Sequence, residues 1–240
     1  MIWKYYANKL VPYTKKFWGV LPARVDFLID VYGVPKNKCG LLVMGADDEK
    51  VKEASLPENK NFIRQKYNID GSKFLIVTGG KIDSSKQQLL LLAEAIYNLK
   101  NSNICLLIFG SIEESLKEKL QMYISNNVKY IGWIDSEKTA IYFAAADLVV
   151  FPGRHSVFWE QVVALGIPMV VKYWEGTQHI DLGGNLKFLY EDSVEEIKNV
   201  IEGIISNKSV YKNMWAAAQN EKRKEFLYSN IAKKSIGLCE

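Results

Sequence analysis

From about residue 71 onward, short apolar runs alternate with longer stretches of helical periodicity. The apolar runs are residues 74–78, 104–109, 128–131, 147–151, 168–171 and 186–190. Between and after them, helical patterns cover residues 88–99, 113–125, 137–146, 156–165 and 194–205. Continuous apolar strands separated by helices are typical of strand–helix–strand units, which form a parallel sheet covered on both faces. The sequence therefore predicts a doubly wound α/β fold.

The two ends of the chain do not follow this alternation. Residues 25–32 have a helical pattern and residues 40–44 resemble a strand. The charged stretch 47–60, which contains Pro57, is predicted to be a loop or linker. Beyond residue 208 the pattern predicts one long helical tail that continues through residue 234. We therefore divide the chain into residues 1–33, 34–70, 71–207 and 208–240, with the sheet in the third part.

Composition excludes several classes of protein. The 240 residues are 48% hydrophobic and 24% charged, which is ordinary for a folded domain and argues against extended disorder. The net charge of +4 is too small to indicate a nucleic-acid partner. Cys39, Cys105 and Cys239 are scattered without metal-ligand spacing, which favours a reducing cytoplasm.

Membrane contact is a separate question. The sequence contains no run of about 18 apolar residues, the length that a spanning helix needs. Residues 3–18, however, mix aromatic side chains with lysines, a combination that can seat a segment at a bilayer interface. Burial against a neighbouring domain explains the aromatic residues equally well. We expect a cytoplasmic protein, with peripheral contact at the inner face of the membrane left open.

Ligands of an open parallel sheet bind beyond the carboxyl ends of its strands, so the loops that follow the apolar runs are the candidate sites. After the first run come Gly79 and Gly80, then Lys81 and Lys86. Two glycines let the backbone approach a ligand closely, and two cations near a helix N-terminus suit a diphosphate. The alternative is a glycine turn with two solvated lysines.

The loop after the fourth run offers a second set of candidates. Ser156 is a predicted N-cap, which leaves the N–H of Val157 free for an anion. Arg154 can pair with phosphate, and His155 can donate a hydrogen bond or exchange a proton. Glu160, near the start of the next helix, can accept hydrogen bonds from ribose hydroxyls. The alternative is a structural helix start in which His155 is a satisfied loop residue.

Two further loops follow strands. Gly132 and Trp133 come after the third run, where the indole either faces a nucleobase or is buried beside a turn. The glycine-rich loop 173–185 contains His179 and Asp181. Two ligands are weak support for a metal site, so we favour a substrate-facing loop and expect no metal. The serine-hydrolase elbow and the zinc-protease motif are absent from the sequence.

Five motifs in order give the chain a family resemblance. They are Gly80-Lys81 with Lys86-Gln87, Phe109-Gly110, Gly132-Trp133-Ile134, Ala146 to Pro152, and Gln161 to Val170. Together they resemble the C-terminal, donor-binding half of GT-B glycosyltransferases of the group 1 type, over roughly residues 34–220. The resemblance implies a Rossmann-like domain that binds a nucleotide-diphosphate sugar.

The same resemblance implies roles for individual residues. Lys81 and Lys86 take the place of the family's lysine and arginine and would neutralise the diphosphate leaving group. The implied donor-binding set is Gly79, Gly80, Lys81, Lys86, Gly110, Gly132, Trp133, Arg154, Ser156, Val157 and Gln161, with His155 and Glu160 as the catalytic candidates. The implied reaction is a retaining transfer of a hexose to a glycan or lipid-linked acceptor, in polysaccharide biosynthesis, with no cofactor besides the donor.

Two departures from the family pattern leave an alternative open. The later of the family's paired glutamates aligns with Gln161, and eight positions earlier stands Gly153. Residues 1–33 are also too few to form the N-terminal Rossmann half that would hold the acceptor. Residues 1–33 would then be a remnant of that N-terminal domain or a linker to it. Otherwise a partner subunit would supply the N-terminal domain. The alternative is a catalytically silent nucleotide-sugar-binding module, and a third hypothesis is an unrelated α/β protein that binds another phosphorylated ligand.

Overall fold

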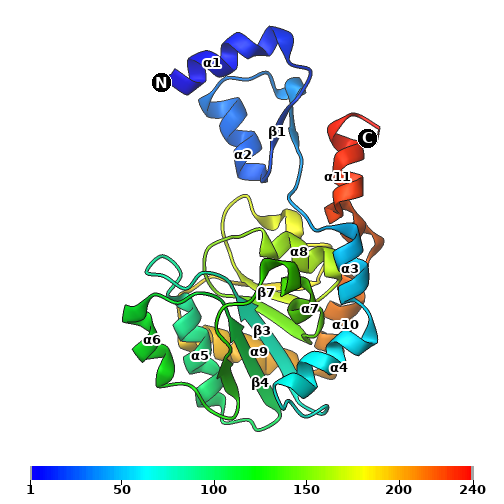
Figure 1. Ribbon diagram of the computed structural model, residues 1–240. Coiled ribbons are helices and arrows are strands. Elements are labelled where there is room, and N and C mark those ends of the chain that lie inside the picture. The colour runs from blue at the N-terminus through cyan, green and yellow to red at the C-terminus, as the bar shows by residue number, and fades with distance from the viewer. Residues whose placement is uncertain (1, 239–240) are drawn as a thin grey trace.

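A computed structural model describes residues 2–238 (Figure 1). Its centre is a parallel sheet of six strands in the order β5-β4-β3-β6-β7-β8. The strands are β3 (Phe74–Gly79), β4 (Ile104–Phe109), β5 (Val128–Tyr130), β6 (Leu148–Phe151), β7 (Met169–Lys172) and β8 (Leu186–Leu189). This arrangement confirms the predicted doubly wound α/β fold, and each strand overlaps one of the six apolar runs.

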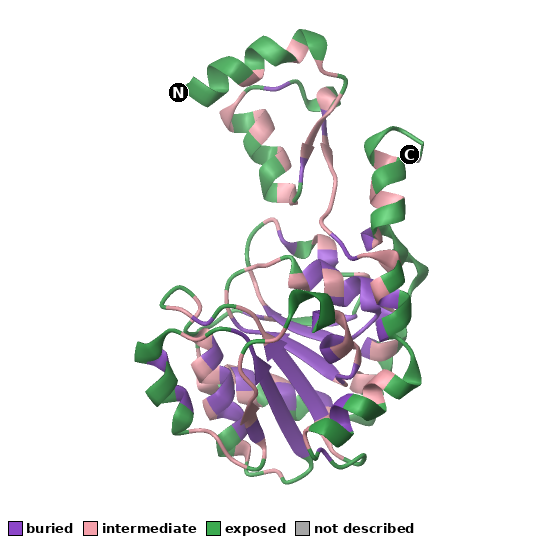
Figure 2. Cartoon of the chain, viewed as in Figure 1, coloured by how far each residue is buried: buried purple, intermediate pink, exposed green. Residues whose placement is uncertain are grey.

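Helices cover both faces of this sheet. One face carries α5 (Gln88–Leu99), α6 (Glu114–Gln121), α9 (Val194–Ser206) and α10 (Lys208–Ala218). The other carries α3 (Asp48–Ala54), α4 (Pro57–Lys66), α7 (Thr139–Ala144) and α8 (Phe158–Leu165). Successive side chains of a strand point to opposite faces, so Leu75 and Val77 enter the second layer while Ile76 enters the first. The buried sheet between two amphipathic layers is visible in Figure 2.

The order of the strands creates a crevice. From β3 the chain moves outward through β4 and β5, then returns to β6 and moves outward the other way through β7 and β8. The two innermost strands pair at Ile76 with Leu148 and at Val77 with Val149. The loops that follow β3 and β6 therefore diverge from neighbouring strand ends, which is where such sheets bind ligands.

The charged stretch 47–60 is helical, so the predicted linker was wrong. The Asp47 side chain accepts a hydrogen bond from the Lys50 N–H at 3.0 Å and caps α3. Pro57 is the first residue of α4, a position where its missing N–H costs nothing. Burial of Val51 and Ile63 in the core then holds these two short helices on the sheet.

The prediction of one long helix for the C-terminal tail was also wrong, since the tail is divided into shorter helical segments. After α10 come the 3₁₀ segment η6 (Glu221–Phe226) and helix α11 (Tyr228–Ser235). Asn220 caps η6 through the Lys222 N–H, and Leu227 is extended. At that break the tail pairs with the chain near its first helices. The Ala46 N–H donates to the Phe226 oxygen, and the Tyr228 N–H donates to the Ala46 oxygen, both at 2.9 Å.

The N-terminal segment lies apart from the large sheet in Figure 1. It contains α1 (Ile2–Leu10), η1 (Val11–Tyr13), β1 (Phe17–Gly19), α2 (Pro22–Asp26), the π-helical η2 (Phe27–Val31), η3 (Lys36–Lys38) and β2 (Cys39–Leu41). Strands β1 and β2 form a two-stranded parallel sheet. No residue of α1 is buried. The remaining short helices, η4 (Ser136–Lys138) and η5 (Gln178–Ile180), lie in loops beyond strand ends.

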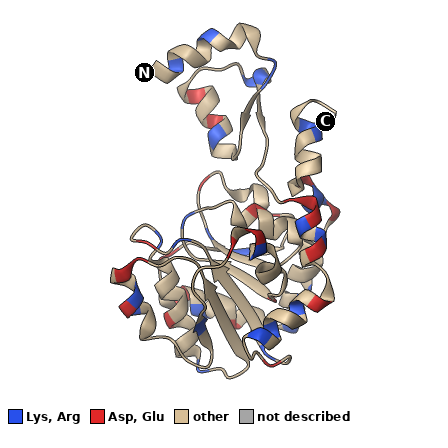
Figure 3. Ribbon diagram, in the orientation of Figure 1, with Lys and Arg blue, Asp and Glu red and all other residues tan. Residues whose placement is uncertain are grey.

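Two properties of the described chain bear on its surroundings. None of the helices in residues 2–238 is both long and apolar enough to cross a membrane. The two signs of charge are interspersed along the helices in the view of Figure 3. Cys39 and Cys105 are free and buried, whereas Cys239 lies outside the described residues.

A buried ion pair ties α4 to the sheet. The Asp147 carboxylate, just before β6, accepts from Arg64 Nη2 at 2.7 Å and from the Leu75 N–H at 2.8 Å. Arg64 is itself buried, and its Nη1 donates to the backbone oxygens of Asp70 and Lys73. Lys60 contacts the other Asp147 oxygen at 2.9 Å, but its side chain is more exposed. Asp147 therefore joins one helix and two strands.

We expect Asp147→Ala to lower the free energy of unfolding by about 3 kcal/mol, because it leaves a buried guanidinium and a strand N–H without their acceptor. The matched variant Lys60→Ala removes the exposed partner and should cost less than about 1 kcal/mol. Urea denaturation followed by circular dichroism measures both. Equal losses in the two variants would contradict this assignment.

Candidate functional site

Glycines end the three strands on one side of the crevice. The Gly80 N–H donates to the Phe109 oxygen at 3.1 Å, and the Gly110 N–H donates to the Gly132 oxygen at 2.8 Å. Gly80 and Gly110 have φ angles of +128° and +126°, which side-chain-bearing residues rarely adopt. A Cβ atom on Gly110 would lie 1.8 Å from the Gly80 oxygen. The backbone is therefore bare where a ligand would approach.

Gly80 and Gly110 line a pocket of about 320 Å³, which is within the range of small-molecule sites. It is also lined by Lys81, Lys86, Trp133, Ser156, Val157 and Phe158. A smaller hollow of about 30 Å³ adjoins it, and there Gly79, Lys81, Lys86, Gly153, Arg154 and Ser156 form the wall. The two hollows thus bring together nine of the eleven residues predicted to bind the donor, from loops far apart in the sequence. The exceptions are Gly132, which lies just before Trp133 without lining either hollow, and Gln161.

Gln161 and the start of α8 differ from expectation. Gln161 lines a separate hollow beside Asp47 and Tyr228, which shares only Ser136 and Thr139 with the larger pocket. Ser156 was predicted as the N-cap, but α8 begins at Phe158 and no side chain caps it. The Ser156 backbone oxygen instead accepts from the Trp159 N–H at 3.0 Å, because the chain already turns one residue before the helix.

The two lysines of the first loop are not equivalent. The Lys81 side chain is 73% exposed, and its Nζ lies 3.2 Å from Asp83. Hydrogen bonds to its carboxylate lower the pKa of Asp83 to about 2. The bond from the Ser85 hydroxyl contributes most to this shift, and the bond from Lys81 contributes next. Lys86 is half-buried, and within residues 2–238 it forms no ion pair. Its charge therefore remains available to an anion, whereas that of Lys81 is partly neutralised.

Trp133 is 71% exposed at the mouth of the pocket. This exposure excludes one of the two alternatives for Trp133, an indole buried beside a turn. Gly132, with a φ of +74°, turns the chain immediately before it. An exposed aromatic face beside a polar pocket is a suitable surface for a planar ring.

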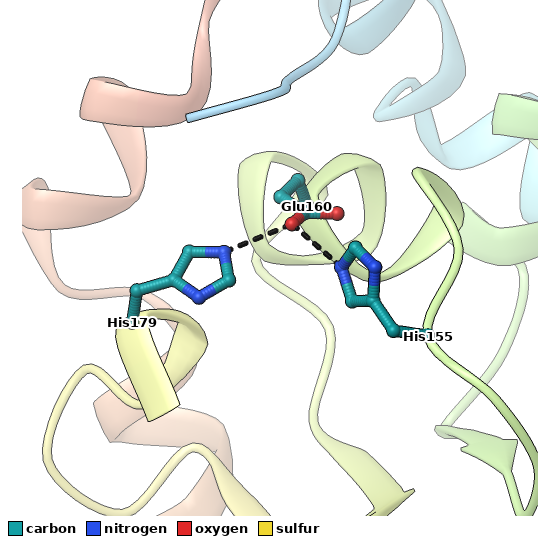
Figure 4. A group of neighbouring side chains, drawn as sticks. All are labelled: His155, Glu160 and His179. Atoms are coloured by element: carbon teal, nitrogen blue, oxygen red, sulfur yellow. Dashed lines mark hydrogen bonds and ion pairs between the residues drawn. The ribbon is translucent and has the colours of Figure 1, made fainter. Parts of the chain in front are cut away.

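Glu160 lies on the far side of α8 from this pocket and is fully buried. Its Oε1 accepts hydrogen bonds from His155 Nε2 at 2.8 Å and from His179 Nε2 at 2.9 Å (Figure 4). Burial raises the pKa of the Glu160 carboxyl, but the hydrogen bonds from the two imidazoles outweigh it and hold that pKa below its ordinary value. Glu160 therefore contacts two histidines, and it lines neither of the two hollows at the strand ends.

The sequence does not link His179 to this group. Asp181, the carboxylate nearest to His179 in the sequence, accepts from the Gly183 and Gly184 N–H groups at 2.9 Å and shapes a turn. The only signal for the cluster was that both histidines of the chain follow strand ends. His155, Glu160 and His179 come from the loop after β6, from α8 and from η5.

A profile of the family described as "Glycosyl transferases group 1" matches residues 73–207, which is more than half of the chain. The chain belongs to this family. The match confirms the resemblance seen in the sequence motifs, and it covers the six-stranded sheet together with α5 to α9. The Rossmann-like domain is therefore that of a group 1 glycosyltransferase.

Individual relatives agree with this family. Mannosylfructose-phosphate synthase of Agrobacterium fabrum is 22% identical over 235 residues, which are 91% of this chain and 51% of that protein. A glycosyltransferase from Rickettsia africae has a TM-score of 0.79 at 18% identity, over 98% of this chain and 65% of that one. The complex of Anabaena HepE with UDP-glucose has a TM-score of 0.72 at 16% identity, over 98% of this chain and 67% of that one. The chain spans about half the length of the curated relative, and its fold matches that of GT-B glycosyltransferases.

We expect Gly110→Ala to destabilise this group 1 glycosyltransferase domain by at least about 2 kcal/mol, because the new methyl group meets the Gly80 oxygen and the φ angle is unfavourable. Gly71→Ala is the matched control, since a Cβ atom there has no neighbour within 4 Å. Thermal unfolding of both variants checks the difference. Equal melting temperatures would show that the strand ends can separate at little cost.

Proposed function

We propose that this chain carries the donor-binding part of a hexosyltransferase, which transfers a sugar from a nucleotide-diphosphate sugar to a glycan or lipid-linked acceptor with retention of configuration. The observation that carries the proposal is the pocket of about 320 Å³ at the switch point of the sheet, where bare glycine backbone meets Lys86 and an exposed Trp133. In this assignment the base lies against Trp133 and the diphosphate lies near Lys86.

The chemistry of the leaving group explains why these residues suit the task. As the bond from the sugar to the diphosphate breaks, negative charge develops on the departing nucleotide. Lys86 and Arg154 would face that charge, together with the N–H groups of Ser156 and Val157 at the start of α8. Preorganised donors of this kind stabilise the transition state more than the ground state. His155 follows Arg154, but its Nε2 is engaged by the buried Glu160 carboxylate, so we assign no proton transfer to it.

The relatives support a nucleotide sugar as the donor. The HepE structures contain UDP, UDP with glucose, and UDP-glucose, and their fold covers nearly all of this chain.

The acceptor would be held by a further domain. The two-stranded sheet β1–β2 is separate from the six-stranded sheet, and the similar structures are longer than this sequence. That domain would belong to the same polypeptide or to a partner subunit. Trp3, Tyr5 and Tyr6 are exposed on α1 near Lys4 and Lys9, so this segment either packs against the further domain or contacts the inner face of a membrane.

A second function is favoured by the residues that stand in place of the family's paired glutamates. Gly153 and Gln161 occupy the positions of the family's two glutamates, and Gln161 lies outside the donor pocket. A module that binds the nucleotide sugar without transferring it, and that completes a partner subunit, is consistent with both features. The two functions share the donor site and differ in turnover.

Calorimetric titration with UDP, GDP and their sugar conjugates tests the shared site. We expect one nucleotide to bind with micromolar affinity. Lys86→Ala should weaken it by about 10- to 100-fold, because a hydrogen bond to a charged group contributes about 1.5–3 kcal/mol. Lys81→Ala should have a smaller effect, and Lys119→Ala, on the exposed face of α6, none. Unchanged affinity in the double variant Lys81→Ala/Lys86→Ala would refute the diphosphate site.

Turnover separates the two functions. We expect the chain, once it is co-expressed with an N-terminal glycosyltransferase half that binds an acceptor, to transfer sugar from the nucleotide that it binds. Transfer is measured as labelled sugar in the acceptor. Donor binding of full strength without transfer would favour the silent module.

A further inference from the structure

The His155–Glu160–His179 cluster has the composition and convergence of a metal site. One nitrogen from each histidine and one oxygen from the carboxylate all lie within 4.8 Å of one another. Figure 4 shows both imidazole rings directing Nε2 toward the same carboxylate. The three residues come from separate elements, so the fold, and not a local sequence motif, brings them together.

Unpartnered polar atoms concentrate at this cluster. Within residues 2–238, five buried side-chain nitrogen or oxygen atoms have no hydrogen-bond partner. Two of them, Glu160 Oε2 and His179 Nδ1, belong to this cluster. Glu160 is fully buried, so water from the surface does not reach its second oxygen. Buried unpaired atoms grouped in this way indicate a missing ion or water.

Charge leads to the same conclusion. Among the described residues, no lysine or arginine forms an ion pair with Glu160, whose only charged-group contacts are the two histidines. A buried carboxylate without a cation is costly, and a divalent ion would offset that cost.

The walls of the cluster are aromatic. The His155 ring meets Trp159 edge-on with centroids 4.9 Å apart, and the His179 ring stacks on Phe226 at 6.3 Å. An apolar shell of this kind excludes water and strengthens the binding of an ion to its ligands.

We propose that His155, Glu160 and His179 bind one Zn²⁺ ion. Two imidazole nitrogens and one carboxylate oxygen are ligands typical of zinc, and three protein ligands leave a fourth position for water. Magnesium and calcium prefer sites made of oxygen alone. The ion would join the loop after β6, which carries Arg154 and Ser156, to the loop that contains η5. The ligands are the chain's own, so the inference does not depend on the proposed function.

The first test is a zinc titration of the whole chain, produced without a histidine tag and freed of metal with EDTA. Calorimetry should show one Zn²⁺ per chain with micromolar or tighter affinity, and no binding of Mg²⁺. Replacement by Co²⁺ should give a visible spectrum of nitrogen and oxygen ligation, without the thiolate bands that binding to cysteine would produce. No zinc binding by the unmodified chain, or thiolate bands in the cobalt spectrum, would overturn the proposal.

Variants assign the ion to the cluster. His179→Ala and Glu160→Gln should each weaken zinc binding by at least about tenfold, since each removes a ligand and loss of even a supporting residue has an effect of this size. Glu175→Gln changes an exposed carboxylate in the same loop and should leave binding unchanged. Circular dichroism shows that each variant is folded. Wild-type affinity in both cluster variants would refute the site.

The outcomes for zinc and for nucleotide are independent. Zinc binding without nucleotide binding supports the metal site and removes the donor site. Nucleotide binding without zinc binding supports the donor site and refutes the metal site.

Discussion

The parallel pairing of β3 with β6 determines where this molecule can bind a ligand. Because the chain winds away from these strands in opposite directions, the loops that follow them separate and leave a crevice between them. The glycines at the ends of β3 and β4 then keep side chains out of its floor. Two layers of helices bury both faces of the sheet, so the crevice stands on a rigid base.

Most of the sheet could be predicted from the sequence, because buried parallel strands are continuous apolar runs and need no knowledge of their neighbours. The helices in residues 48–66 could not, since short charged helices held by Val51 and Ile63 have little periodicity of their own. The break in the tail at Leu227 depends on its pairing with Ala46, a contact across most of the chain. Local patterns do not contain such information.

The candidate site shows the same division. The sequence placed glycines and cations correctly at strand ends, because the position of a loop in a parallel sheet follows from the order of its elements. It could not distinguish Lys81 from Lys86, since only the folded chain brings Asp83 beside one of them and leaves the other half-buried. Nor could it assign Glu160 to His155 and His179. The direction in which a helical side chain points is set by how the helix docks on the sheet.

The bonds between Ala46 and residues 226–228 have a consequence for evolution and engineering. They bring the beginning and the end of the sheet domain to a single point, so residues 46–228 form a closed unit with both ends together. Domains whose ends meet can be inserted into other proteins or permuted with little disturbance. This unit could therefore be exchanged between enzymes by recombination at two sequence positions that lie side by side in the fold, while its own core stays intact.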